Sequence, residues 1–137
     1  MRDRAGIVLC CKHKNKILLI FRKKDGREYR VVPGGGVEKN ETLGAAAKRE
    51  IFEELGLSVT KMSDFCEINS ERGREKYYLS YLPEDIPLEI QCEELKRNGL
   101  NNVYSPRWLS EEDLQKIELC PPQIKNALAV LLAKQAK

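Results

Sequence analysis

Three glutamates, Glu50, Glu53 and Glu54, stand at positions i, i+3 and i+4 of one segment, directly after Arg49. At about 100° per residue, an α-helix would bring their carboxylates onto one face. Carboxylates that close repel one another, and the repulsion grows where water is excluded. The spacing therefore predicts a bound cation that several of these oxygens share.

The chemistry of the expected ligands indicates which cation this is. Carboxylate oxygens without a nearby histidine or cysteine favour Mg²⁺, with Mn²⁺ as a substitute, over zinc or copper. Mg²⁺ in proteins usually keeps several waters and coordinates substrate phosphates together with a few carboxylates. We therefore expect Mg²⁺ as the cofactor and a substrate that contains phosphate.

The element that must position these acids is a helix over residues 42–55. The segment lacks proline and is rich in good helix formers. Thr42 can cap the start of the helix, and Gly56 can end it. An apolar stripe lies on a different face from the acids and consists of Ala47, Ile51 and Leu55. One face of this helix should therefore pack on a core while another gathers negative charge.

The same stretch resembles a known family. From Gly35 the pattern runs through five residues to Glu41, and after seven more it reads Arg49-Glu50-Ile51-x-Glu53-Glu54-x-Gly56-Leu57. Every position specified by the signature of the Nudix hydrolases is filled. The resemblance implies an α/β fold, an α/β/α sandwich with a central mixed β-sheet. It also implies a Mg²⁺-dependent pyrophosphohydrolase, which cleaves a diphosphate linkage in a nucleoside diphosphate joined to another group X.

The resemblance further implies roles for individual residues. Glu53 and Glu54 would ligate the metal, with Glu50 as a further ligand or as the general base, and the Gly34 carbonyl would complete the ligand set. Arg49 would orient the glutamates, so the expected catalytic residues are Glu50, Glu53 and Arg49. The alternative for Arg49 is an ordinary i, i+4 surface pair with Glu53, worth a few tenths of a kcal/mol.

Substrate binding is expected to involve the glycines before the helix and strand arginines. Gly35 and Gly36 allow the backbone to approach a phosphate. Arg22, Arg27 and Arg30 could contact it with their forked guanidinium groups, and Arg22 is the preferred candidate. The alternative for Arg22 is a solvated strand arginine. Glu41 would support the charge of the site from outside. Aromatic side chains that could stack a base or instead fill the core are Tyr77, Tyr78, Tyr81, Tyr104 and Trp108.

The sequence leaves the general base open. Glu50 is one candidate, and the others lie downstream of the helix. Glu71 and Glu75 flank a predicted turn, whereas Glu93 and Glu94 follow a predicted strand. Each of these glutamates could equally be an exposed residue without a catalytic role.

Strand and helix patterns on both sides of the acidic helix predict the rest of the fold. Runs rich in β-branched, aromatic and other apolar residues predict strands at 5–12, 16–24, 27–32, 57–69, 75–82, 86–92 and 103–109. Gly34-Gly35-Gly36 is expected to be a loop. A short helix should begin at Ser110, and a terminal helix should cover residues 121–136. With 137 residues, 42% of them hydrophobic, we expect one domain over residues 1–137.

Composition limits the environment and the partners of the chain. The net charge of +3 gives no strong indication of nucleic-acid binding, and the apolar runs are too short to span a bilayer. The five cysteines are scattered without metal-ligand spacing, and the start of the chain lacks a cleavage site for secretion. These features predict a cytoplasmic protein with reduced thiols.

Several alternatives remain open at the level of function. The chain could be a nucleotide-binding sensor without activity, although such a domain would be expected to lose the acidic residues. It could also act on RNA caps or dinucleoside polyphosphates, or on a non-nucleotide diphosphate. Two copies could pair through Ala129, Leu131 and Leu132 of the terminal helix, but core packing explains these residues equally well.

Overall fold

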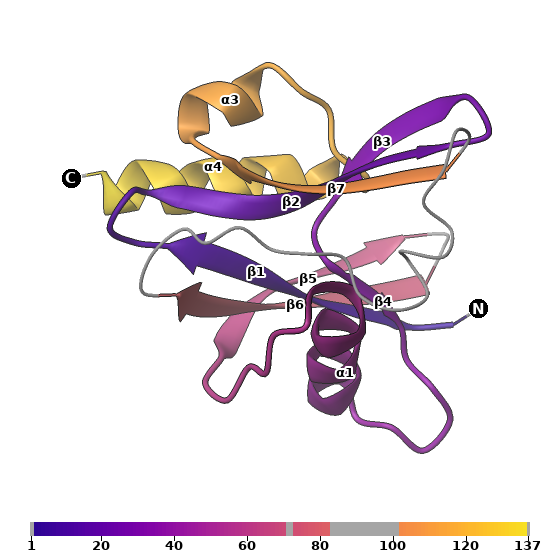
Figure 1. The fold of residues 1–137 in the computed structure, drawn as a ribbon. Coiled ribbons are helices and arrows are strands. Elements are labelled where there is room, and N and C mark those ends of the chain that lie inside the picture. Colours follow the sequence, from indigo (N-terminus) through magenta and orange to yellow (C-terminus); the bar gives the residue numbers. More distant parts are fainter. Residues whose placement is uncertain (1, 71–72, 83–101, 137) are drawn as a thin grey trace.

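The computed structural model describes residues 2–70, 73–82 and 102–136. Within these ranges the strands are β1 (Arg4–Cys11), β2 (Lys16–Lys24), β3 (Arg27–Val31), β4 (Gly34–Gly36), β5 (Ser63–Ser70), β6 (Gly73–Leu82) and β7 (Asn102–Leu109). The helices are α1 (Leu43–Leu55), α3 (Glu111–Gln115) and α4 (Gln123–Gln135). Figure 1 shows how these elements are arranged.

All seven strands belong to one mixed sheet. Its main path is β3-β2-β1-β6-β5, with β4 paired to β1 and β7 paired to β2. Strands β1 and β6 are parallel, with Arg4 beside Glu75, and the other pairs are antiparallel. β4 joins the sheet through short antiparallel pairing in which Gly34 lies opposite Gly6. The central strand β1 is therefore in contact with the segment that leads into α1.

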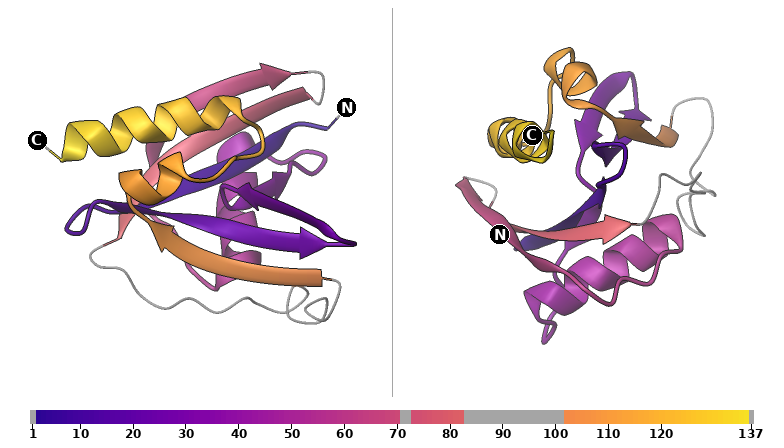
Figure 2. Two further views of the ribbon diagram at one scale, coloured as in Figure 1. Left: turned by 90° about the horizontal axis from the view of Figure 1, so that it is seen from above. Right: turned by 90° about the vertical axis from the view of Figure 1, so that its left-hand side faces the viewer.

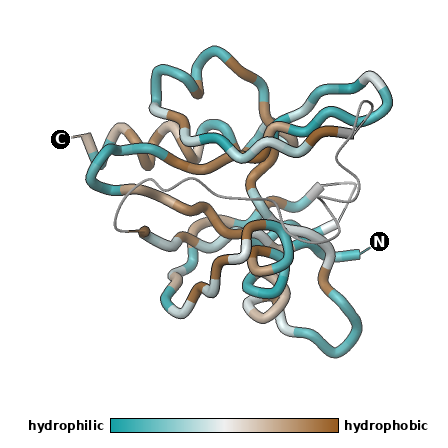
Figure 3. Tube along the Cα trace, in the orientation of Figure 1, coloured by the Kyte–Doolittle hydropathy of each residue, from teal (hydrophilic) through white to brown (hydrophobic). Residues whose placement is uncertain are grey.

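The sheet lies between helices, as two views of the ribbon show (Figures 1 and 2). Side chains alternate along β1, and this alternation builds two hydrophobic clusters. Ile7 and Leu9 pack in one cluster with Ile51 of α1, whereas Val8 packs in the other with Leu128 of α4. Figure 3 shows hydrophobic residues along the middle of β1 and β2. The predicted α/β/α sandwich with a mixed sheet is therefore confirmed.

Two elements differ from the sequence prediction. The glycines 34–36, predicted as a loop, form β4 because the backbone groups of β1 pair with them and pairing needs no side chain. The strand predicted over residues 57–69 begins only at Ser63, and Leu57 and Val59 instead pack beside α1 in its cluster. The strand predicted at residues 86–92 lies outside the described residues.

The remaining elements agree with the prediction to within a few residues. Ser110 and Asp113 form a reciprocal capping box at the start of α3. α4 begins directly after Pro122 and buries Ile124, Leu128 and Leu132. None of the helices within the described ranges is long and apolar enough to cross a membrane.

Candidate active site

Helix α1 carries the acidic residues, and its ends are fixed as the sequence predicts. The Thr42 hydroxyl accepts a hydrogen bond from the Ala45 N–H at 3.1 Å. At the other end Gly56 has a left-handed conformation with φ of 71°, and its N–H donates to the Phe52 carbonyl. The helix buries Ala46, Ala47, Ile51 and Leu55 against the sheet. This packing fixes which face of α1 carries Glu50, Glu53 and Glu54.

Arg49 is the centre of the hydrogen bonds on this face. Its Nε and Nη2 donate to the two carboxylate oxygens of Glu41, at 2.7 and 3.0 Å. Nη1 donates to Glu50 at 3.0 Å and to Glu53 at 3.2 Å, and Nη2 also donates to the Gly36 carbonyl at 3.0 Å. The guanidinium therefore contacts far more than the Glu53 partner of a simple i, i+4 pair. It links α1, the segment before it and β4.

The surroundings of Glu41 and Glu50, two carboxylates beside Arg49, shift their pKa values in opposite directions. Hydrogen bonds from Arg49 lower the pKa of Glu41 to about 2. Burial raises the pKa of Glu50, and the hydrogen bond from Arg49 only partly opposes this effect. Glu41 is therefore held as the anion, while Glu50 has an increased tendency to hold a proton.

Strand β4 lies against the acidic face of α1. The Gly34 N–H donates to a carboxylate oxygen of Glu54 at 2.9 Å, and the Glu54 side chain is buried. A Cβ atom on Gly35 would fall on the carboxylate of Glu50. Only a glycine at position 35 therefore allows Glu50 to lie directly over the strand.

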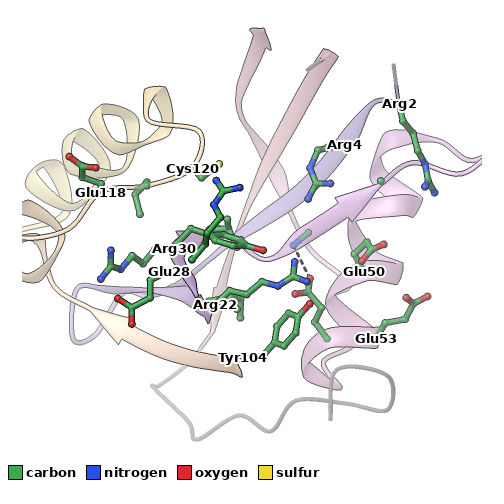
Figure 4. Close-up of a pocket in the computed structure, with 18 residues that line it drawn as sticks. Arg2, Arg4, Arg22, Glu28, Arg30, Glu50, Glu53, Tyr104, Glu118 and Cys120 are labelled. Carbon is green, nitrogen blue, oxygen red and sulfur yellow. Dashed lines mark hydrogen bonds between the residues drawn. The ribbon is translucent and has the colours of Figure 1, made fainter. Parts of the chain in front are cut away.

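A cavity of about 820 Å³ opens in front of these carboxylates (Figure 4). One wall comes from α1 and β4, and the opposite walls come from β1, β2, β3, β7 and the segment before α4. Its arginines are Arg2, Arg4, Arg22, Arg27 and Arg30, and its glutamates are Glu28, Glu50, Glu53, Glu54 and Glu118. This volume is within the range of sites for small ligands of nucleotide size. The cavity thus brings cationic side chains and the acids of α1 to one space.

The donor set at the α1 wall suits a hard cation. Glu50, Glu53 and Glu54 offer only oxygen. The Glu53 side chain is 49% exposed, and Arg49 holds it by a single hydrogen bond of 3.2 Å. Among the described residues, no three acidic, histidine or cysteine side chains are already grouped closely enough to hold a metal. In this arrangement Arg49 and the Gly34 N–H use the carboxylate oxygens instead. The residue types therefore fit Mg²⁺, and binding would exchange some of these hydrogen bonds for metal contacts.

Glu75, another candidate for the general base, does not line the main cavity but a smaller one beside β4. It is buried, 3% exposed, and accepts a hydrogen bond from the Tyr77 hydroxyl at 3.0 Å. Tyr77 belongs to the cluster on the α4 face of the sheet, and Glu75 lines a small cavity there together with Gly34 and Gly35 of β4. Arg4 approaches the same carboxylate at 3.9 Å. Glu71, Glu93 and Glu94 lie outside the described residues.

The aromatic residues considered as base platforms have other neighbours. Tyr77 lies in the core, and Tyr78 and Trp108 pack against the α1 cluster. Tyr104 lines the cavity and stacks on Arg22, at 4.5 Å from the ring centroid. Tyr81 donates a hydrogen bond to Gln135 of α4. Within the described residues, Tyr104 is thus the only one of the five that lines the cavity.

Sequence reasoning did not identify every residue of the cavity. Arg4 begins β1, and Arg2 lies two residues before it. Two arginines at i, i+2 in an extended segment would lie on one face, and this spacing is the signal that could have found them. Glu118 and Cys120 come from the segment before α4, where no local pattern indicates a site. They reach the cavity because the Cys120 N–H donates to the Arg30 carbonyl of β3.

Comparison with known proteins shows the family to which the chain is similar. The family model described as NUDIX domain matches residues 1–130. A human diphosphoinositol polyphosphate phosphohydrolase is 26% identical over 127 residues, which cover 86% of this chain and 66% of that protein. An RNA pyrophosphohydrolase of Pasteurella multocida is 39% identical over 57 residues, covering 42% of this chain and 27% of that protein. The match therefore spans 66% of the length of the human relative and 27% of the length of the bacterial one.

A solved structure extends the similarity to the whole fold. A MutT structure described for Aliivibrio salmonicida and Vibrio cholerae has a TM-score of 0.73 and 18% identity, and the match covers 98% of both chains. At this identity the similarity concerns the fold. The acidic signature, the α/β/α sandwich and the family match over residues 1–130 lead to one conclusion: the chain belongs to the NUDIX family, with a MutT-like fold.

Proposed function

We propose that the chain is a Mg²⁺-dependent pyrophosphohydrolase that cleaves a diphosphate linkage in a nucleoside diphosphate joined to another group X. The observation that carries the proposal is the position of Glu50, Glu53 and Glu54 on one wall of an arginine-lined cavity. Hydrolysis of a phosphoric anhydride requires neutralised phosphate charge, a positioned water and a proton acceptor. The residues of the cavity can meet each of these requirements.

Glu53, Glu54 and the Gly34 carbonyl would hold the metal, with Glu50 as a further ligand if it does not serve as the general base. Mg²⁺, when bound, supplies positive charge to the phosphate oxygens around the bond that is cleaved. Glu53 is the most exposed of these three glutamates, and it is the one that turns most readily to a ligand. Gly35 and Gly36 would let the substrate approach the backbone, and Arg22 would contact its phosphates.

Glu50 is the residue we assign as general base. Burial raises its pKa, which brings the carboxylate closer to the range in which it can accept a proton from water. The hydrogen bond that Glu50 accepts from Arg49 fixes the orientation of its carboxylate. Arg49 would therefore act by positioning Glu50 and Glu53 while Glu41 holds Arg49 from the other side.

The test is the substitution Glu53→Gln, which removes a charged oxygen from a partly exposed side chain. We expect turnover to fall by at least about 100-fold, since the phosphates and the water lose their positioned charge. The thermal unfolding midpoint should change by less than about 2 °C, because an exposed ion pair contributes little. Calorimetric titration with Mg²⁺ should show weaker binding than in the wild type. The variant Glu67→Gln, at an exposed position of β5, is the matched control and should retain activity and Mg²⁺ binding.

The substrate panel should contain nucleoside triphosphates, ADP-ribose, nucleotide sugars, dinucleoside polyphosphates and a diphosphoinositol polyphosphate, with products identified by mass. The diphosphoinositol compound represents the second candidate, a non-nucleotide diphosphate, which the name of the human relative favours. If Glu53→Gln cleaved these compounds as fast as the wild type, the assignment of the site would be wrong. If no compound were cleaved but nucleotides still stabilised the protein, a sensor domain would be supported instead.

We further propose one domain over residues 1–137, a cytoplasmic location and no dependence on nucleic acid. The single sheet that joins the described strands supports one domain, and the free thiols of Cys10, Cys11, Cys66 and Cys120 suit a reducing compartment. A homodimer is a separate possibility that light scattering tests. Leu132 is buried in the core, so a contact between copies would have to use other residues of α4.

A further inference from the structure

The arginines of the cavity are arranged differently from Arg49. They come from the start of the chain, β1, β2 and β3, opposite the acidic wall. Figure 4 shows Arg4 and Arg22 extending from separate strands into the space in front of Glu50. Arg22, Arg27 and Arg30 form no ion pair with any carboxylate in the described part of the chain, whereas Arg49 contacts four glutamates. Arg30, however, lies over the Phe21 ring, 5.3 Å from its centroid, and Phe21 faces the opposite side of β2 from Arg22. Arg22 and Arg27 are therefore the two cationic groups of this set that are available to an anionic ligand.

Arg22 is fixed by two aromatic rings. Its guanidinium carbon lies 4.5 Å from the centroid of Tyr104 and 5.5 Å from that of Tyr29. Stacking uses the face of a guanidinium and leaves the N–H groups at its edge available to oxygen acceptors. The Nε of Arg22 is buried and has no acceptor among the described residues. A buried donor of this kind is expected to meet an acceptor when the site is filled.

The stacking of Arg22 on Tyr104 and Tyr29 also affects how a nucleobase could be recognised. Tyr104 is only 7% exposed, and Arg22 lies over its ring. The second ring beside Arg22, that of Tyr29, also faces the guanidinium. Tyr104 therefore offers no open face to a nucleobase, and one face of Tyr29 is taken by the guanidinium. The cavity offers its strongest interactions to phosphate oxygens.

We propose that the substrate is recognised through a run of three or more phosphates, with Arg22 as the residue that selects for this run, and that the base is read weakly. The proposal rests on the proposed hydrolase function and specifies its substrate class. The acidic wall receives the linkage that is cleaved, while Arg22 and Arg27 bind phosphates further along the run. Nucleoside triphosphates, dinucleoside polyphosphates and inorganic polyphosphate share this chemistry.

The side of the cavity that carries Arg22 and Arg27, here called the arginine wall, can be tested by binding alone. Calorimetry in EDTA, which removes divalent metal, measures this binding without turnover. The probes are pyrophosphate, tripolyphosphate and AMP. We expect tripolyphosphate to bind at least about ten-fold more tightly than pyrophosphate, and AMP to bind more weakly than either, because bidentate arginine contacts to phosphate are strong and add with each group. Equal affinity for pyrophosphate and tripolyphosphate, or tighter binding of AMP than of pyrophosphate, would overturn the proposal.

The variant Arg22→Lys keeps the charge but removes the forked, stacked geometry. It should weaken tripolyphosphate binding by about ten-fold and pyrophosphate binding by less than about three-fold. Arg107→Lys is the matched control, since Arg107 also stacks on a ring, that of Phe21 at 4.4 Å, but does not line the cavity. The control should bind as the wild type does. If Arg22→Lys unfolds, Tyr29→Leu on the edge strand β3 should produce the same loss of selectivity, and wild-type selectivity in a folded variant would contradict the role of the stack.

Turnover separates this proposal from the proposed function. With Mg²⁺, kcat/KM should be at least about ten-fold higher for ATP and diadenosine tetraphosphate than for ADP-ribose, and GTP should match ATP within about three-fold. Inorganic tripolyphosphate as a third substrate shows whether a nucleoside is needed at all. Equal cleavage of ADP-ribose and ATP would leave the hydrolase intact and overturn the selection for three phosphates. Selective tripolyphosphate binding without any cleavage would support the arginine wall and overturn the hydrolase.

Discussion

Arg49 and Glu41 form the contact on which the geometry of the acidic residues depends. Two parallel hydrogen bonds, at 2.7 and 3.0 Å, join the guanidinium to this one carboxylate. The remaining N–H groups of Arg49 are then directed at Glu50, Glu53 and the Gly36 carbonyl. A residue outside the proposed metal ligands therefore determines how two of those ligands lie.

This contact predicts how stability depends on pH. The pKa of Glu41 is about 2 in the folded protein, below its ordinary value of 4.5. Its contribution to the free energy of unfolding is therefore complete above about pH 4.5, and it is lost as the pH falls from there through about 2. In the variant Glu41→Gln this part of the acid dependence should disappear, because glutamine does not titrate. Urea unfolding at pH 7, 4.5 and 2.5 measures the difference.

The control for this prediction is Glu67→Gln, at an exposed position of β5. Its unfolding free energy should follow the pH dependence of the wild type. If Glu41→Gln lost as much stability between pH 4.5 and 2.5 as the wild type does, Glu41 would not be the group that Arg49 holds as an anion.

At the scale of elements, β4 and α1 are fitted to each other. Glu50 lies over the backbone of Gly35, and the Gly34 N–H holds Glu54. In the variant Gly35→Ala, the new Cβ would fall on the Glu50 carboxylate, so the carboxylate or the strand must move. We expect kcat to fall by about 100-fold, the typical cost of displacing a catalytic group by about 1 Å. Steady-state kinetics with the best substrate of the panel measures this loss.

Gly44→Ala is the matched control for Gly35→Ala. Gly44 lies in the first turn of α1, and the nearest atom to a new Cβ there is the flexible end of Met62, at 3.2 Å. Alanine also favours the helical conformation over glycine. This variant should keep wild-type kcat, with unchanged or higher thermal stability. If both variants lost activity equally, disturbance of α1 as a whole would explain the loss better than contact with Glu50.

These two elements also show what the sequence could predict. α1 follows from local information, because Thr42, Gly56 and the helix formers between them act within one segment. β4 does not, because three glycines have no preference for a strand and pair only where β1 presents free backbone groups. Likewise the sequence predicts Glu50, Glu53 and Glu54 on one face, but not that Arg22 stacks on Tyr104, since these residues are 82 positions apart and meet only through the β2–β7 pairing.

At the scale of the whole molecule, the sheet separates two hydrophobic clusters. The cluster on the α1 face lies beneath the acidic residues, and the cluster on the α4 face does not. Ile51 packs in the cluster on the α1 face, directly after Glu50 in the chain. Leu128 packs in the cluster on the α4 face. Both side chains are fully buried, with 0% exposure. The two positions therefore permit a comparison between equal losses of packing on opposite faces.

Truncating each residue to alanine should separate stability from activity. Ile51→Ala and Leu128→Ala should each lower the unfolding free energy by about 2–5 kcal/mol, measured by urea denaturation, because each leaves a cavity in a packed core. Well below the unfolding midpoint, Leu128→Ala should keep kcat within about two-fold, since α4 contributes no residue to the acidic wall. Ile51→Ala should lower kcat by at least about ten-fold, because the helix that carries Glu50 loses its anchor on the sheet. An equal loss of kcat in both variants would mean that the two faces act as one unit, and that the site depends on the stability of the whole sheet rather than on the packing beneath α1.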